Sequence, residues 1–91
     1  MYSLKYSKKF RKDIKRAHRK KIVDLKKLRK ILDTLSLEEK LVKKYYHHKL
    51  HGKLKDCYAY HLRPDLVLIY QKDKKNKIIY LLRIGSHSEL F

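Results

Sequence analysis

Two apolar runs in the second half of the chain constrain its fold most strongly. Leu66–Tyr70 is apolar throughout, and Lys77–Ile84 contains a second run rich in isoleucine and leucine. The polar segment Lys72–Lys77 between them carries Asp73 and Asn76, which are typical of a hairpin turn. Short continuous apolar runs are typical of strands covered on both faces. The runs therefore predict two buried antiparallel strands, with Leu66–Tyr70 central in a sheet.

The residues before these runs predict one more strand and a turn. Leu50–Leu62 has the composition of a strand, with an irregularity expected near Asp56, and Leu37–Lys49 reads as a connection. Cys57 cannot form an intrachain disulfide because it is the one cysteine, and we expect it to be a small buried strand residue. The Arg63-Pro64-Asp65 sequence predicts a turn, since proline fixes its own backbone angle and restricts the residue before it.

The first part of the chain predicts a strand and two basic helices. Tyr2–Tyr6 alternates apolar and polar residues, and Ser7 offers an N-cap for a helix of about ten to twelve residues. Lys21–Leu35 repeats the helical spacing with a wider apolar stripe. The chain of 91 residues is enough for one modest core. We therefore expect residues 1–91 to form one α+β domain: an N-terminal strand, two helices, then a three- to four-stranded antiparallel sheet with the helices on one face.

Charge limits the kind of partner. The chain has 26 Lys and Arg against 9 Asp and Glu, a formal net charge of +17. Such a charge favours a polyanionic partner, and nucleic acid or a nucleoprotein is the first expectation over an acidic protein or a membrane surface. There is no apolar run long enough to span a bilayer and no signal-peptide core, so we expect a soluble cytoplasmic protein.

Histidines gather in the second half, where they could take and give protons near neutral pH. His61 precedes the predicted turn. Asp65, within the turn, is close enough to His61 either to orient its ring or simply to cap the turn. His87 follows a Gly-Ser break after the last strand. Two acid–base groups with a cation suit cleavage of RNA by its own 2′-hydroxyl, which needs a base, an acid and stabilisation of the phosphorane.

Two further residues near the C-terminus fit that chemistry. Arg83 ends the last predicted strand, and its planar guanidinium can hold two phosphate oxygens at once. Phe91 is either a frayed terminus or a surface on which a base stacks. The tail that contains Arg83, His87 and Phe91 is therefore the first candidate for half of an RNA-cleaving site.

A second group, His47, His48 and His51, raises the question of a metal site. No acidic or thiolate ligand has a supporting spacing, and the surrounding lysines repel a cation. We therefore predict no metal and no small-molecule cofactor, and we expect a solvated loop for His47 and His51.

Three sequence blocks resemble the RelE superfamily of bacterial toxins, and specifically its YafQ-like branch of messenger-RNA interferases. The blocks are His48–Gly52, His61–Asp65 with the strand after it, and Arg83–His87 with the terminal Leu90-Phe91. The order of strand, helices and sheet agrees as well, so the resemblance covers nearly the whole chain. Leu54, Tyr58 and Ala59 depart from the family pattern, which bears on codon preference and efficiency.

The resemblance implies a function and a site. It implies a toxin of a type II toxin–antitoxin system that cuts translated messenger RNA in the ribosomal A site without a metal, and that a small acidic antitoxin inhibits. Matched by position, the acid–base set is His48, His61, Asp65 and His87, with Arg83 on the phosphate and Phe91 as the terminal aromatic. The alternative is a non-catalytic module that binds nucleic acid or the ribosome and whose histidines are incidental.

Overall fold

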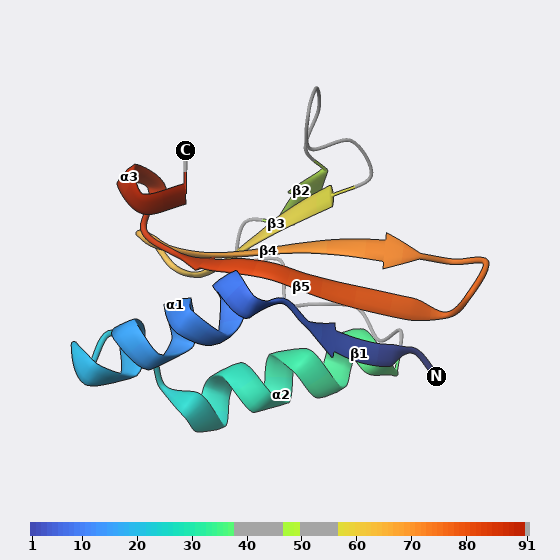
Figure 1. Ribbon diagram of the computed structural model, residues 1–91, viewed down its shortest axis with the longest axis horizontal. Coiled ribbons are helices and arrows are strands. Elements are labelled where there is room, and N and C mark those ends of the chain that lie inside the picture. The colour runs from blue at the N-terminus through green and yellow to red at the C-terminus, as the bar shows by residue number, and fades with distance from the viewer. Residues whose placement is uncertain (38–46, 50–56, 91) are drawn as a thin grey trace.

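The computed structural model describes residues 1–37, the backbone of residues 47–49, and residues 57–90 (Figure 1). Its elements are β1 (Ser3–Tyr6), α1 (Lys8–Arg19), α2 (Leu25–Ser36), β2 (His47–Lys49), β3 (Cys57–Arg63), β4 (Leu66–Asp73), β5 (Ile78–Gly85) and α3 (His87–Leu90). The predicted α+β order of a strand, two helices and a three- to four-stranded antiparallel sheet is confirmed, with β2, β3, β4 and β5 as the antiparallel strands.

The strands form one sheet in the order β1-β5-β4-β3-β2. Each neighbouring pair in the series β2, β3, β4 and β5 is antiparallel, whereas β1 pairs with β5 in parallel. A parallel neighbour requires a long crossover, and here β1 and β5 are separated by all the other elements of the sheet and by α1 and α2. The prediction that Leu37–Lys49 is only a connection is wrong at its end, where β2 pairs with β3; a strand of three residues is too short to show a periodicity.

The hydrophobic core lies mainly between the sheet and the two long helices, which cover the same face of the sheet (Figure 1). Leu66–Tyr70 is buried throughout in the central strand β4, as predicted. Cys57, also buried as predicted, belongs to a smaller cluster of buried residues with Ala59, Val67 and Ile69. Leu90 of α3 packs against this second cluster.

Helix α1 begins as predicted, because the Ser7 hydroxyl accepts a hydrogen bond from the Phe10 N–H. Helix α2 begins at Leu25, four positions later than the predicted start at Lys21. Lys21 has a left-handed φ of 58°, which ends α1, and the Asp24 carboxylate caps α2 by accepting from the N–H groups of its first turn. In the described part of the chain, no helix has the length and apolar character needed to cross a membrane.

Candidate active site

Two histidines and an aspartate from three different elements meet beside the β3–β4 turn. The Nε2 atoms of His61 and His87 are 3.3 Å apart, and their ring centroids are 5.2 Å apart. Asp65 Oδ1 is 3.2 Å from His87 Nδ1 and also accepts the backbone N–H of His87 at 3.1 Å. The structure therefore brings together three of the residues that the sequence predicted, in the order His61, His87, Asp65.

Asp65 holds His87 by both its backbone and its ring. The backbone and side-chain hydrogen bonds from His87 lower the pKa of the Asp65 carboxyl below its ordinary value. A carboxylate that accepts from Nδ1–H leaves Nε2 of His87 as the reactive nitrogen. Both side chains are open to solvent, with 53% of His87 and 73% of Asp65 exposed, so a large substrate can reach them.

The short helix α3 places His87 in this position. The sequence had predicted only a turn after the last strand, but Ser86 and Glu89 form a capping box: the Ser86 N–H donates to Glu89 Oε1 at 3.0 Å, and the Glu89 N–H donates to the Ser86 hydroxyl at 3.3 Å. A Cβ on Gly85 would lie 3.1 Å from Glu89 Oε1, so glycine allows this close approach. The Ser-x-x-Glu spacing was the signal that could have predicted α3.

Arg83 is held by a buried carboxylate that no sequence motif predicted. Asp13 of α1 is only 2% exposed, and it accepts from Arg83 Nε at 2.7 Å and from Arg83 Nη2 at 3.1 Å. This side-on pairing leaves the Nη1 group and the second proton of Nη2 at the end of the guanidinium unused by Asp13. Arg83 is thus fixed in orientation, with donors remaining for a phosphate.

Asp13 also completes the edge of the sheet. Beyond the paired stretch of β1, the N–H of Ile84 in β5 donates to Asp13 Oδ2 at 3.1 Å. Burial by itself raises the pKa of Asp13, but the hydrogen bonds from Arg83 and Ile84 outweigh burial, so the net pKa is lowered. The same partnership raises the pKa of Arg83. Asp13 is therefore ionised, and it binds the Ile84 N–H of β5, its helix neighbour Arg16 and the guanidinium of Arg83.

A chain of ion pairs links this carboxylate to α3. Arg16 donates through Nη2 to Asp13 Oδ1 and through Nε to Glu89 Oε2, both at 2.9 Å. The order Arg83, Asp13, Arg16, Glu89 is called the ion ladder below. Because Glu89 caps the helix that carries His87, the ladder fixes Arg83 and His87 relative to the same helix, α1.

Strands β3 and β5 each have a register irregularity, and each irregularity lies next to a candidate site residue, His61 or Arg83. In β5 the register shifts so that Arg83 pairs with Ile69 while Leu81 pairs with Tyr70, which leaves Leu82 as an extra residue next to Arg83. The irregularity expected near Asp56 lies outside the described residues, whereas β3 has one between His61 and Arg63. Bulges of this kind redirect side chains beside active sites.

The remaining predicted site residues are not placed with the cluster. The backbone register puts His48 of β2 opposite Ala59 in β3, two residues before His61, and its side chain lies outside the described part. Phe91 and His51 also lie outside the described residues. Among the residues that the structure describes, no group of three or more His, Cys, Asp or Glu side chains is arranged to hold a metal ion.

Two of the positions that depart from the family pattern serve the interior of the protein. Tyr58 is partly buried and its ring is stacked on Tyr70 with centroids 5.4 Å apart. Ala59 is 1% exposed in the smaller cluster. The third, Leu54, lies outside the described residues.

Known proteins resemble the chain in sequence and in structure. Residues 2–91 match the family model of a bacterial toxin of type II toxin–antitoxin systems, YafQ. A metal-bound toxin from Helicobacter pylori is 47% identical with a TM-score of 0.90, and the match covers 100% of both chains. YafQ in the DinJ–YafQ complex from Escherichia coli is 32% identical with a TM-score of 0.86, covering 100% of this chain and 99% of that one. A mutant of Escherichia coli YafQ is 29% identical with a TM-score of 0.85, over 100% of this chain and 99% of that chain. No curated protein sequence matches the chain.

These matches confirm the resemblance inferred from the three sequence blocks. The family model spans nearly the whole chain. The metal-bound toxin is 47% identical over the full length of both chains, which indicates a common family and not only a common fold. The chain belongs to the YafQ family of bacterial toxins of type II toxin–antitoxin systems.

Proposed function

We propose that this toxin is a ribosome-dependent endoribonuclease that cleaves translated messenger RNA in the ribosomal A site by metal-independent acid–base catalysis. It would act in the cytoplasm and so inhibit translation and growth. The observation that carries the proposal is the pair of histidine nitrogens 3.3 Å apart, with the Asp65 carboxylate on the far side of the His87 ring.

The reaction needs one group to take a proton and one to give a proton. The base removes the proton of the ribose 2′-hydroxyl, O2′ attacks phosphorus, the P–O5′ bond breaks, and the acid protonates the leaving O5′. The products are a 2′,3′-cyclic phosphate and a 5′-hydroxyl. A hydrogen bond between the two Nε2 atoms requires one N–H and one lone pair, so the His61–His87 pair contains both functions.

We assign the acid to His87 and the base to His61. Asp65 orients the His87 ring by accepting from Nδ1–H, and His87 acts as the acid in the form that also carries a proton on Nε2, which it gives to the leaving O5′. The donors of Arg83 that Asp13 does not use supply the cation for the phosphorane, at a position fixed in advance by the ion ladder. Outside the described residues, His48 and Phe91 remain predicted members of the site.

Primer extension on messenger RNA in a translating extract tests the proposal. His87→Ala should lower cleavage by about 100-fold or more, the usual effect of an acid–base group. His18→Ala is the matched control because His18 is an exposed histidine of α1 and is not one of the three residues of the cluster. Arg83→Lys keeps a cation beside Asp13 but loses the guanidinium fork, and it should also reduce cleavage strongly. Full cleavage by His87→Ala would overturn the proposal.

Chelation separates this mechanism from a metal-dependent one. The related Helicobacter pylori toxin is a metal-bound protein, so the question applies directly. We expect EDTA to leave the cleavage rate unchanged, because a proton donor, a proton acceptor and a cation are all present as side chains. Loss of cleavage in EDTA that zinc or copper restores would assign the chemistry to a metal.

We also propose an acidic antitoxin as the physiological partner. The net charge of +17 favours an acidic protein, and Escherichia coli YafQ forms a complex with DinJ. Co-expression with the product of the neighbouring gene should yield a complex that does not cleave RNA. Failure to recover an acidic partner, with no acidic product encoded beside the toxin, would contradict this part of the proposal.

The charge also supports a second candidate, a basic module that binds RNA or the ribosome without cleaving it. The solvent faces of α1 and α2 carry exposed lysines and arginines that suit phosphate contacts. Salt-sensitive binding without scission, unchanged in His87→Ala, would favour this module over the enzyme.

A further inference from the structure

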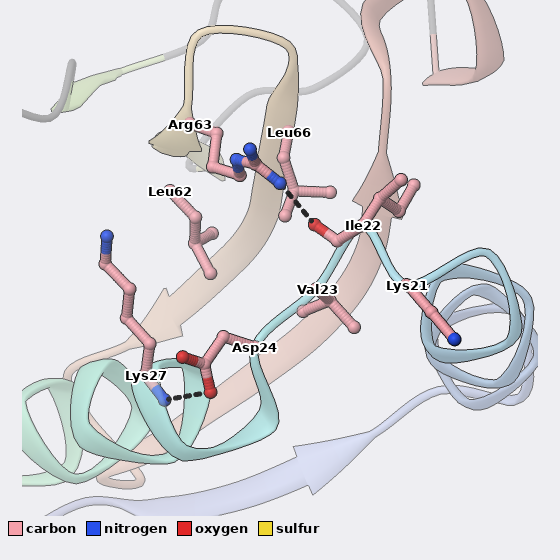
Figure 2. A pocket seen from close by; sticks show the side chains of 8 residues that line it. All are labelled: Lys21, Ile22, Val23, Asp24, Lys27, Leu62, Arg63 and Leu66. Atoms are coloured by element: carbon pink, nitrogen blue, oxygen red, sulfur yellow. Dashed lines mark hydrogen bonds between the residues drawn. The ribbon is translucent and has the colours of Figure 1, made fainter.

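A pocket of about 230 Å³ lies between the β3–β4 turn and the connection of α1 to α2 (Figure 2). Its lining includes Ile22, Val23, Lys27, Leu62, Arg63 and Leu66. It is smaller than typical sites for drug-sized ligands, at roughly 300–1,000 Å³, and has room for one planar base. We propose that this pocket binds an unpaired nucleotide of the RNA, next to the position that is cleaved.

The lining combines an apolar surface with cations from separate elements. Leu62 and Leu66 are 2% and 3% exposed and form the apolar side. Figure 2 shows the Leu62 side chain between those of Lys27 of α2 and Arg63 of β3. Apolar and planar surfaces stack with bases, whereas lysine and arginine contact phosphates. An apolar wall with a cation on each side therefore fits a base and its two flanking phosphates.

One acidic residue, Asp24, also lines the pocket. Its carboxylate accepts the backbone N–H groups of Lys26 at 3.0 Å and Lys27 at 3.4 Å, so it serves as the N-cap of α2. The pocket contains two further cations besides Arg63, namely Lys21 and Lys27, and its balance is positive. An anionic ligand is thus favoured even with Asp24 ionised.

The β3–β4 turn connects this pocket to the candidate active site. His61 reaches His87 of α3, whereas Arg63, two residues later, donates through Nη1 to the carbonyl of Ile22 at 3.4 Å. The register shift between His61 and Arg63 accounts for the two directions. Asp65 is the last residue of the turn and Leu66 is the first residue of β4, and these neighbours face different sites: Asp65 contacts His87, whereas Leu66 lines the pocket. An RNA strand that passes over this turn meets the histidines on one side and the pocket on the other.

This inference rests on the proposed function, because it takes RNA to be the substrate, yet its test does not require cleavage. The probe is a 2′-O-methyl hexanucleotide, which lacks the nucleophile and cannot be cut. We expect it to shift the methyl signals of Ile22, Leu62 and Leu66 in the nuclear magnetic resonance spectrum. An abasic hexamer with the same phosphates should shift them much less, since it has no base to insert. Equal shifts with hexaglutamate would overturn the inference in favour of an acidic protein segment.

Adjacent lysines provide a matched pair of variants. The backbone N–H groups of Lys26 and Lys27 both bind Asp24 and both side chains are exposed, but only Lys27 lines the pocket. Lys27→Ala should reduce the slope of log affinity against log salt by about 0.7, the value for one phosphate contact on a single strand. Lys26→Ala should leave the slope unchanged. Equal slopes for the two variants would mean diffuse attraction and would refute a pocket.

The two proposals fail in different ways. Methyl shifts in the pocket together with absent cleavage on ribosomes would refute the enzyme and keep the RNA site. Cleavage that depends on His87, with no methyl shift at any hexanucleotide concentration up to saturation of the protein, would refute the pocket and keep the enzyme. Arg63→Gln gives a second variant for the pocket, and a weaker affinity for the hexanucleotide is expected from the loss of its charge.

Discussion

Replacing Asp13 with asparagine tests the ion ladder, because the change keeps the shape of the side chain and removes its charge. Each carboxylate oxygen of Asp13 accepts two hydrogen bonds: Oδ1 from Arg83 Nη2 and Arg16 Nη2, and Oδ2 from Arg83 Nε and the Ile84 N–H. Asparagine has one acceptor oxygen and one amide group that only donates. Whichever way the amide is turned, its NH₂ group faces two donors, and at least two of the four bonds are lost.

The cost follows from these contacts. A hydrogen bond to a charged group contributes about 1.5–3 kcal/mol, so two lost bonds set an upper range of roughly 3–6 kcal/mol. The guanidinium groups recover part of this from water, because the Arg16 and Arg83 side chains are 38% and 30% exposed. We expect Asp13→Asn to lower the free energy of unfolding by about 2–3 kcal/mol, or the melting temperature by roughly 10–20 °C for a domain of this size.

The lowered pKa of Asp13 predicts how the stability difference between wild type and Asp13→Asn changes with pH. The folded pKa of Asp13 lies below its ordinary value, so its carboxylate contributes stability above the unfolded pKa of about 3.9, and this contribution is lost as the pH falls through the folded pKa. Urea unfolding followed by circular dichroism should therefore show a large difference in the free energy of unfolding between wild type and Asp13→Asn at neutral pH. The gap should narrow progressively below about pH 4.

Asp33→Asn is the control, since it makes the same chemical change at an exposed position of α2. It should unfold with the wild type at every pH. If Asp13→Asn unfolds at the same urea concentration as Asp33→Asn, the carboxylate does not support the fold. A gap that stays constant down to pH 3 would show that its effect is steric and not ionic.

Three further outcomes are expected from the same geometry. Asp65→Asn should lower cleavage by about 100-fold while urea unfolding stays unchanged, because the carboxylate orients His87 from an exposed position; equal cleavage by the variant would assign Asp65 to turn capping alone. Glu89→Gln keeps an oxygen for the capping box but loses the ion pair with Arg16, so the free energy of unfolding should fall by only about 0.5 kcal/mol. The Leu90 amide, which binds the Ser86 carbonyl in α3, should exchange faster with deuterium, and an unchanged exchange rate would argue against the ion ladder as an anchor of α3. Phe91→Ala should reduce cleavage without changing the rate at which Glu89 exchanges, and full cleavage would remove the terminal aromatic from the site.

The elements that the sequence predicted well are those whose signal is local. The apolar run Leu66–Tyr70 is buried in the central strand because no polar residue interrupts it. Ser7 caps α1 for the reason it was expected to, a hydroxyl placed before a helical stripe. The start of α2 was missed since the stripe extends back to Ile22, while Lys21 in a left-handed conformation and the cap at Asp24 delay the helix. The parallel pairing of β1 with β5 depends on contacts between chain ends and has no local signature.

The sequence predicted the acid–base residues of the candidate site but not the residue that holds Arg83. The motif residues His61, Asp65 and His87 do lie together, and that proximity depends on the turn and on α3, which a capping-box search would have found. The partner of Arg83 was missed because Asp13 is a charged residue on the buried face of α1, which Phe10, Ile14 and Ala17 otherwise make apolar. Asp13 lies on the same side of that helix, three residues after Phe10 and four before Ala17.

Acidic residues are the more informative positions in a chain with this charge. With 26 basic residues, a lysine or arginine can lie almost anywhere on the surface, whereas only 9 acids are available to pair with them. In the described part of the chain, Asp13 holds Arg83, Asp65 holds His87 and Glu89 caps α3. Asp24 caps α2, and Asp73 closes the β4–β5 hairpin by accepting from the backbone and side chain of Asn76. Five of the six acids in the described part, all except the exposed Asp33 of α2, thus mark points where a very basic chain is held in one conformation. In this fold those points include both the candidate acid–base pair and the candidate phosphate-binding arginine.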